Sequence, residues 1–332
     1  MPEYRRDLLT GQMVIVAEER AARPHQFDIT DKPFQAICPF CEGNESLTPP
    51  EIAAFRRTDS APNTPGWSVR TVPNKYPAVV PGDGKRLPPP TFQGKTDGIG
   101  LHEVIIDTPR HVLSISELTP SEVAGMLVMY RLRLRTLRTD SRWSFVQIFK
   151  NVGAAAGASL PHSHSQLVAI PFLPPSLQQM LDRAENYTRK HQHCFWCGYL
   201  EKEIQTGERI VEETEHFIVL CQFVSRFAGE MEIYPKNHEA GFDQVDVSVL
   251  DELAALFCRT IIRLEKAIFW MKDSLAYNIV LSTEPFRPDV SSFFHWRFSI
   301  LPSLARAAGF EWGTGLHINP IPPEQAAQRL RE

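Results

Sequence analysis

The densest group of reactive side chains lies at residues 150–166, where a loop of small residues leads into two histidines and a glutamine. Glycine and alanine let a backbone approach a bulky ligand closely, and the N–H groups of such a loop can hold phosphate oxygens. His162, His164 and Gln166 follow at alternate positions, so an extended strand places all three on one face. This combination favours a site for a phosphorylated ligand over the alternative, a buried polar strand edge beside a flexible loop.

Cysteine spacing adds a second chemical signal. Four of the six cysteines form two CxxC pairs, Cys38 with Cys41 and Cys194 with Cys197. In a reducing cytosol such pairs indicate metal binding or redox chemistry rather than a disulfide scaffold.

The two CxxC pairs open two halves that share one order of features. In each half the pair is followed by a histidine after a proline-containing turn, His111 in the first and His238 in the second. A helix pattern, a strand, a loop and a histidine leading into another strand come next, with His162 and His295 as those histidines. This order predicts a duplicated α+β unit whose copies pack as a pseudo-dimer, with residues 1–175 and 176–332 as its two parts. Two unrelated domains are the alternative.

The helices and strands that must position these residues are visible as patterns. Thr119 and Glu122 read as a capping box with Pro120 at the first helical position, and a second apolar helix is expected over Leu250 to Phe269. The apolar face of the first helix comprises Val123, Met126, Leu127, Tyr130, Leu134 and Leu137. The expected strands are Phe145–Phe149 and Gln166–Pro171 in the first half and Asn278–Ser282 and Arg297–Pro302 in the second.

Composition narrows the function classes. The hydrophobic fraction of 43% is that of an ordinary globular protein, and the net charge of −4 gives no basic field for nucleic acid. No apolar stretch approaches the length of a membrane span, and no signal core follows the N-terminus. We therefore expect a cytoplasmic protein that binds neither nucleic acid nor membrane.

The sequence resembles the galactose-1-phosphate uridylyltransferase family of the histidine-triad superfamily over nearly its whole length. The resemblance is closest to a subgroup with HSHSQ and a paired-zinc pattern, which also contains plant ADP-glucose phosphorylase-like enzymes. Besides HSHSQ, the matching motifs are Leu9-Thr10-Gly11-Gln12, Arg20 to Pro24, Pro73-Asn74-Lys75-Tyr76-Pro77, His102-Glu103-Val104 and Gly309 to Gly315. The resemblance implies two tandem histidine-triad-like units, each an antiparallel sheet with helices.

The family resemblance assigns the catalytic roles. His164 corresponds to the nucleophile, whose imidazole attacks the α-phosphorus of a nucleotide sugar to give a covalent nucleotidyl-histidine. Gln166 would donate an amide hydrogen bond to a phosphoryl oxygen. The hydrolase branch of the superfamily carries a histidine in place of Gln166, and because glutamine cannot shuttle a proton, the sequence favours transfer over hydrolysis.

The resemblance also implies two structural zinc ions per chain, one in each half. In the first half, His162 is a ligand with Cys38, Cys41 and His111, a closed Cys2His2 set. The repeat predicts Cys194, Cys197, His238 and His295 for the second, with His216 as the competitor of His238. The second half has Arg297 where the first has its nucleophile, so we expect this half to be catalytically silent. Arg297 is then either a phosphate or carboxylate contact or a solvated or core-edge residue.

The expected substrates are a nucleotide sugar and a sugar 1-phosphate or phosphate, and we expect the chain to form a homodimer. The resemblance also suggests a set of residues that bind these substrates. That set is Arg20, Arg23, Asn74, Lys75, Asn151, Gly157 and Ser159, together with Gln166. The leading function is transfer of UMP, or AMP, between a nucleotide sugar and a hexose 1-phosphate. The alternatives are adenylyl transfer from ADP-glucose to inorganic phosphate, as in an ADP-glucose phosphorylase, and a non-catalytic zinc-scaffolded nucleotide-binding protein. The base, the sugar and the acceptor stay open.

Overall fold

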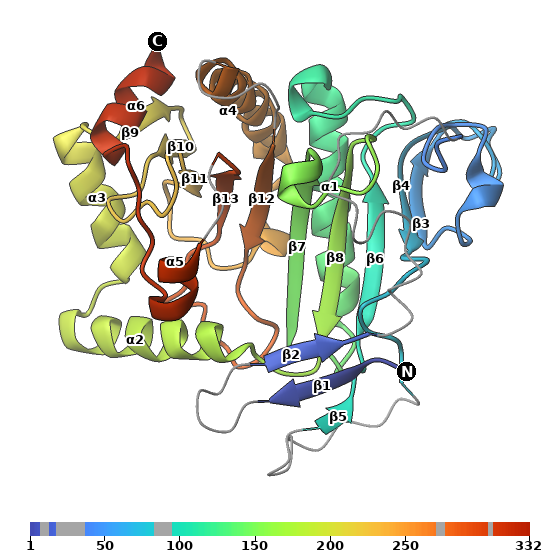
Figure 1. Ribbon diagram of the computed structural model, residues 1–332, viewed down its shortest axis with the longest axis horizontal. Helices are drawn as coiled ribbons and strands as arrows, with labels where there is room; N and C mark the ends of the chain where they lie inside the picture. The colour runs from blue at the N-terminus through green and yellow to red at the C-terminus, as the bar shows by residue number, and fades with distance from the viewer. Residues whose placement is uncertain (7–12, 18–36, 83–94, 270–275, 305–307) are drawn as a thin grey trace.

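The structure, a computed structural model, describes residues 1–6, 13–17, 37–82, 95–269, 276–304 and 308–332. Within these residues, ten strands form one antiparallel sheet that runs across the molecule (Figure 1). In spatial order the strands are β3 (Ala53–Arg56), β4 (Trp67–Pro73), β6 (Leu101–Ile106), β8 (His164–Ile170), β7 (Phe145–Val152), β12 (Tyr277–Ser282), β13 (Arg297–Pro302), β11 (Met231–Pro235), β10 (Phe217–Leu220) and β9 (Ile210–Glu213).

The sheet consists of two halves with the same strand topology. Five strands come from residues 53–170 and five from residues 210–302. From the centre outward, the first half has the order β7, β8, β6, β4, β3, and the second half has the matching order β12, β13, β11, β10, β9. The halves join where β7 pairs with β12, for example Phe149 with Val280. The predicted α+β duplication is therefore confirmed, and the pseudo-dimer is held by a shared sheet rather than by side-chain packing alone.

Two long helices cover one face of this sheet. Helix α1 (Pro120–Arg138) begins with the predicted capping box between Thr119 and Glu122, and all six residues of its predicted apolar face are buried. Helix α4 (Leu250–Phe269) is its counterpart in the second half, and α1 and α4 pack against each other. One continuous core contains residues of both helices and inward-facing residues of the central strands, such as Ile148, Leu167 and Ile279. Residues that alternate with Leu167 along β8 lie on the opposite face, and these include His164 and Gln166.

Shorter elements surround the sheet. Between the two halves of the sheet lie helix α2 (Pro175–His191) and helix α3 (Phe195–Thr206). The remaining α-helices are α5 (Gly309–Thr314) and α6 (Pro323–Arg331), and a small sheet has the order β2 (Met13–Val16), β1 (Glu3–Arg6), β5 (Lys95–Asp97). Among the residues that the structure describes, the 3-10 helices are η2 (Glu45–Leu47), η3 (Ile115–Glu117), η4 (Ala154–Ala156), η5 (Phe242–Gln244) and η6 (Val247–Val249). Among the helices that the structure describes, none is long and apolar enough to cross a membrane.

Candidate active site and paired metal centres

The small-residue loop connects β7 to β8 and is hydrogen-bonded to a residue of the second half of the chain. It contains η4, flanked by Gly153 at φ 81° and Gly157 at φ 84°, positive values that favour glycine over residues with a Cβ. The Asn278 amide of β12 donates hydrogen bonds to the Asn151 side-chain oxygen at 2.8 Å and to the Ala156 carbonyl at 2.9 Å. The loop shape is thus set by two glycines and fixed by a residue of the other half.

His164 is the first residue of β8 and is buried. Its Nδ1 lies 2.7 Å from the His162 carbonyl oxygen, which can only accept a hydrogen bond, so Nδ1 carries the proton and Nε2 keeps its lone pair. Burial lowers the pKa of His164 to about 4, so the ring is neutral at pH 7. The edge contact with the Phe40 ring, at 5.1 Å between centroids, adds to its apolar surroundings. The ring is fixed, neutral and presents a nucleophilic nitrogen.

Gln166 lies two residues further along the same face, beside a histidine of the neighbouring strand. Its Oε1 is 3.0 Å from His102 Nε2, and the Asn74 amide nitrogen is 3.1 Å from that same His102 nitrogen. The structure therefore brings the predicted residues Gln166 and Asn74 together around His102. From the sequence, His102 was named only as part of a motif that matches the family. Its position beside the HxHxQ strand depends on the register between β6 and β8, which cannot be read from the sequence.

The other predicted substrate contacts lie in or next to loops, or outside the described residues. Lys75 is exposed, Ser159 is half-buried in the loop before His162, and Arg20 and Arg23 lie outside the described residues. Asn151 and Gly157 belong to the glycine-flanked loop described above.

A buried polar network lies on the face of β8 opposite His164 and Gln166. The two serines of HSHSQ alternate with the histidines and so point to the opposite face, where Ser163 and Ser165 both donate to Asp107, at 2.9 and 3.2 Å. The Lys150 ammonium donates to the Asp107 carboxylate at 2.5 Å and to the Ser163 hydroxyl at 2.7 Å, and both ions are almost fully buried. The sequence did not reveal this pair, although the alternating serines indicate that the second face of the strand is polar.

The first cysteine pair forms a compact four-residue cluster with two histidines. The ligand atoms of Cys38, Cys41, His111 and His162 lie within 4.8 Å of one another. The sulfur-to-Nδ1 distances are 3.5 Å from Cys38 to His162, 3.3 Å from Cys41 to His111 and 3.7 Å from Cys41 to His162. Tetrahedral zinc with ordinary Zn–S and Zn–N bonds requires about 3.6 Å between such atoms, so the cluster fits the metal.

Hydrogen bonding at the far side of the ring supports this fit. His162 Nε2 lies 2.9 Å from the Thr108 carbonyl oxygen, so it carries the proton and leaves Nδ1 free to bind a metal. Burial and the adjacent Cys38 raise the pKa of the Cys41 thiol to about 11, because two neighbouring thiolates repel each other without a cation. A bound divalent metal is the group that would stabilise both thiolates.

The second half contains the matching cluster. Cys194, Cys197, His238 and His295 also have their ligand atoms within 4.8 Å of one another. The Nδ1 atoms of His238 and His295 lie 3.2 and 3.8 Å from the Cys197 sulfur. Their Nε2 atoms contact the carbonyl oxygens of Ser291 and Pro235, at 2.8 and 2.9 Å, as His162 contacts Thr108.

The competitor for this cluster, His216, is paired elsewhere. His216 Nδ1 lies 2.6 Å from a carboxylate oxygen of Glu252, and this contact raises the pKa of His216. Arg297, at the position that corresponds to His164, donates to the Glu232 carboxylate at 3.1 Å and lies over the Trp196 ring. It is a carboxylate contact, one of the roles that the sequence left open for it.

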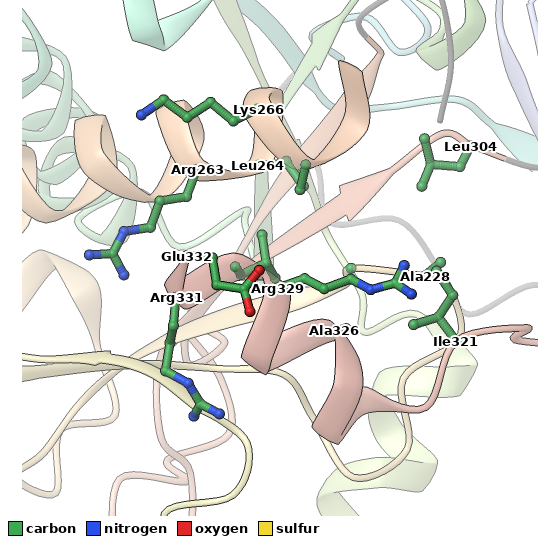
Figure 2. A pocket seen from close by; sticks show the side chains of 13 residues that line it. Ala228, Arg263, Leu264, Lys266, Leu304, Ile321, Ala326, Arg329, Arg331 and Glu332 are labelled. Carbon is green, nitrogen blue, oxygen red and sulfur yellow. The ribbon is translucent and has the colours of Figure 1, made fainter. Parts of the chain in front are cut away.

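A cavity of about 730 Å³ lies between α4 and α6 (Figure 2). Its lining includes Arg263 and Arg331, both labelled in Figure 2, which donate to the backbone carbonyl oxygens of Val211 and Ile210. Its lining contains no predicted site residue, so we place the candidate active site at the HxHxQ strand.

Comparison with known proteins agrees with this geometry. Residues 1–174 match the family model described as galactose-1-phosphate uridyl transferase, N-terminal domain, and residues 106–332 match a domain of unknown function. The chain is 32% identical to ADP-glucose phosphorylase of Arabidopsis thaliana, with 100% of this chain and 93% of the relative covered. It is 31% identical to galactose-1-phosphate uridylyltransferase of Thermotoga maritima, with 100% and 98% covered.

Solved structures give the same picture. The crystal structure of the Arabidopsis thaliana ADP-glucose phosphorylase with bound ADP-glucose superposes with a TM-score of 0.77 at 30% identity, covering 100% of this chain and 99% of that one. A uridylyltransferase structure superposes with a TM-score of 0.80 at 25% identity, covering 99% and 97%.

Proposed function

This chain belongs to the galactose-1-phosphate uridylyltransferase family and is an enzyme of the nucleotidyl transferase type, and from this premise we propose that it transfers its nucleotidyl group through His164. The observation that carries the proposal is the geometry of that ring. Its Nδ1 is committed to the His162 carbonyl oxygen, which leaves Nε2 as the one nitrogen able to attack phosphorus.

In the proposed reaction, His164 Nε2 forms a bond to the α-phosphorus of a nucleotide sugar. The bond from that phosphorus to the bridging oxygen breaks, and the sugar 1-phosphate leaves with the electron pair. An acceptor phosphate oxygen then attacks the same phosphorus, and the P–N bond returns its electrons to His164. In this scheme the Gln166 amide and the N–H groups of the loop between Asn151 and Ser159 would stabilise the phosphoryl oxygens.

The leading substrates are UMP donors and a hexose 1-phosphate acceptor. A second candidate is adenylyl transfer from ADP-glucose to inorganic phosphate, which is favoured by the likeness to the Arabidopsis thaliana ADP-glucose phosphorylase in both sequence and structure. We assign the contacts to Arg20, Arg23, Asn74, Lys75, Asn151, Gly157 and Ser159. Catalysis is assigned to residues 1–175, while residues 176–332 are the silent unit.

Two structural zinc ions and a homodimer complete the proposal. The Cys2His2 clusters fit zinc, which would fix the start of β8 through His162 and so orient His164. For self-association, the segment after β13 exposes Phe310, Trp312, Leu316 and Ile318, a concentration of apolar surface typical of an interface. A monomeric mass by light scattering at micromolar concentration would exclude the homodimer.

The deciding experiment incubates the protein with UDP-glucose or ADP-glucose carrying radiolabel in the α-phosphate, without acceptor. We expect one of them to label the protein through a bond that is acid-labile and base-stable, as a phosphoramidate is. Adding hexose 1-phosphate or inorganic phosphate should discharge the label and identify the acceptor. Absence of label from both donors, with nucleotide binding intact, would support the non-catalytic binder instead.

A further inference from the structure

We propose that His102 is a positioning residue that locks the Gln166 side-chain amide in the one orientation that presents its NH2 group to the transferring phosphoryl group. The proposal rests on the function proposed above and adds to it a residue outside the HxHxQ motif. His102 and Gln166 are both buried, and they lie on one face of neighbouring strands: Val104 is directly opposite Gln166, and His102 is two residues before Val104.

The protonation state of His102 follows from its neighbour on the other side. The backbone N–H of Ala78 lies 3.0 Å from His102 Nδ1, and a backbone N–H can only donate. His102 Nδ1 must therefore carry a lone pair, which makes the ring neutral with its proton on Nε2. A protonated ring would place two N–H groups against each other at this contact.

The proton on Nε2 in turn fixes Gln166. Because His102 Nε2 is a donor, the Gln166 atom 3.0 Å away must be the carbonyl oxygen, and the amide nitrogen is turned away from His102. The Asn74 amide nitrogen lies 3.1 Å from the same Nε2 and is itself a donor. The orientation of this amide is fixed because its side-chain oxygen accepts from the Tyr76 N–H at 2.9 Å. The opposite tautomer would let Asn74 donate to Nε2 but would lose the bonds to both Ala78 and Gln166.

Orientation decides what Gln166 does to a phosphate. With its oxygen held by His102, the amide presents two N–H donors, and in the part of the chain described here no other residue accepts from them. A flipped amide would instead present a carbonyl oxygen to a negatively charged phosphoryl oxygen, replacing attraction by repulsion. Ala78, His102 and Gln166 thus form a chain of hydrogen bonds, and the chain ends in the Gln166 NH2 group, which would donate to the transferring phosphoryl group.

Two substitutions separate this role from support of the Asn74–Ala78 loop. In His102→Asn, the side-chain oxygen can reach the position of Nδ1 and accept from Ala78, but no donor reaches Gln166. In His102→Gln, the longer side chain places a donor near the position of Nε2, while the Ala78 N–H loses its acceptor. Each variant keeps one of the two bonds.

The readout is the single-turnover rate of label transfer to His164 from the α-labelled donor that labels the wild type, with KM, metal content and thermal unfolding measured alongside. We expect His102→Asn to slow labelling by about tenfold or more at unchanged KM and metal content, and His102→Gln to restore most of the rate. In a Gln166→Ala background, the same His102→Asn change should have no further effect, because the residue it acts through is gone.

Other outcomes discriminate clearly. If wild type forms no label, the proposed function fails before His102 is tested. If wild type is labelled but His102→Asn matches it, or if His102→Asn and Gln166→Ala slow labelling by independent factors, the positioning role is overturned. If His102→Gln is the slower variant, His102 acts by holding the loop through Ala78 rather than by orienting Gln166.

Discussion

Adjacent positions on one strand face have different roles in this site. His164 has a free Nε2, whereas His162 directs its Nδ1 at two cysteine sulfurs and its Nε2 at the Thr108 carbonyl. We therefore predict that His164→Ala abolishes labelling by the nucleotide sugar and leaves metal content and unfolding unchanged. His162→Ala should lower labelling, metal content and stability together. Label retained by the His164 variant would move the nucleophile to another residue.

The buried ion pair behind β8 predicts a stability effect. Removing the cation by Lys150→Met leaves the Asp107 carboxylate buried without its partner, which should lower the free energy of unfolding by about 3–5 kcal/mol. The double variant with Asp107→Asn should regain part of this loss, because no uncompensated charge remains. Both are measured by denaturant unfolding. A Lys150→Met protein as stable as wild type would show that Asp107 is neutral in the fold.

At the residue scale, the sequence predicted what lies in one short segment and failed for what meets across strands. Alternation along residues 162–166 was enough to place two histidines and a glutamine on one face. The Lys150–Asp107 pair joins residues 43 positions apart. It exists because β7, β8 and β6 pair in one particular register, and a shift by one residue would turn these side chains to the other face.

Helix α1 shows how far local signals determine an element. Its capping box and its apolar spacing were both predicted, since each depends on residues within a few positions of one another. The joining of β7 to β12 was not predicted, because edge pairing between two units leaves no periodic trace in either strand. Helix α2 was not predicted either.

The cap of α1 also carries a pH-dependent prediction. Burial raises the pKa of Glu122, but hydrogen bonds from Arg110 and the Thr119 backbone outweigh it and bring the pKa to about 2, against 4.5 for a free side chain. Because the folded pKa is lowered, the contribution is complete above about pH 4.5 and is lost as pH falls toward 2.

Glu122→Gln should therefore reduce stability at pH 7 by roughly 1 kcal/mol, a value that allows for partial exposure, and by much less near pH 2. The measurement is urea unfolding of both proteins across this range. An equal difference at both pH values would mean that the charge of Glu122 makes no contribution.

At the scale of the whole molecule, the two halves share one architecture but differ at the positions proposed for the chemistry. Both halves retain the strand order, the long helix and the Cys2His2 cluster. His164 and Gln166 are matched in the second half by Arg297 and Ser299, and both of these donate to the Glu232 carboxylate. A guanidinium that is held by a carboxylate has neither a lone pair nor the freedom to attack phosphorus, which supports the assignment of catalysis to the first half.

This arrangement predicts different consequences for losing each metal. The first cluster includes His162, two residues before the proposed nucleophile His164, whereas all residues of the second cluster lie in the half that we propose to be silent. Cys38→Ser should lower zinc from two ions per chain to one, destabilise the fold, and slow labelling of His164. Cys194→Ser should also leave one zinc and a less stable protein, because a structural zinc contributes directly to folding. The Cys194→Ser protein should still be labelled at temperatures where it remains folded.

Cys258→Ser is the matched control, since Cys258 is buried in the core apart from both clusters and its loss should leave both ions bound. Metal analysis and labelling of the three variants decide the matter. If Cys194→Ser loses labelling as completely as Cys38→Ser while still folded, the second half contributes to catalysis and is not a silent copy.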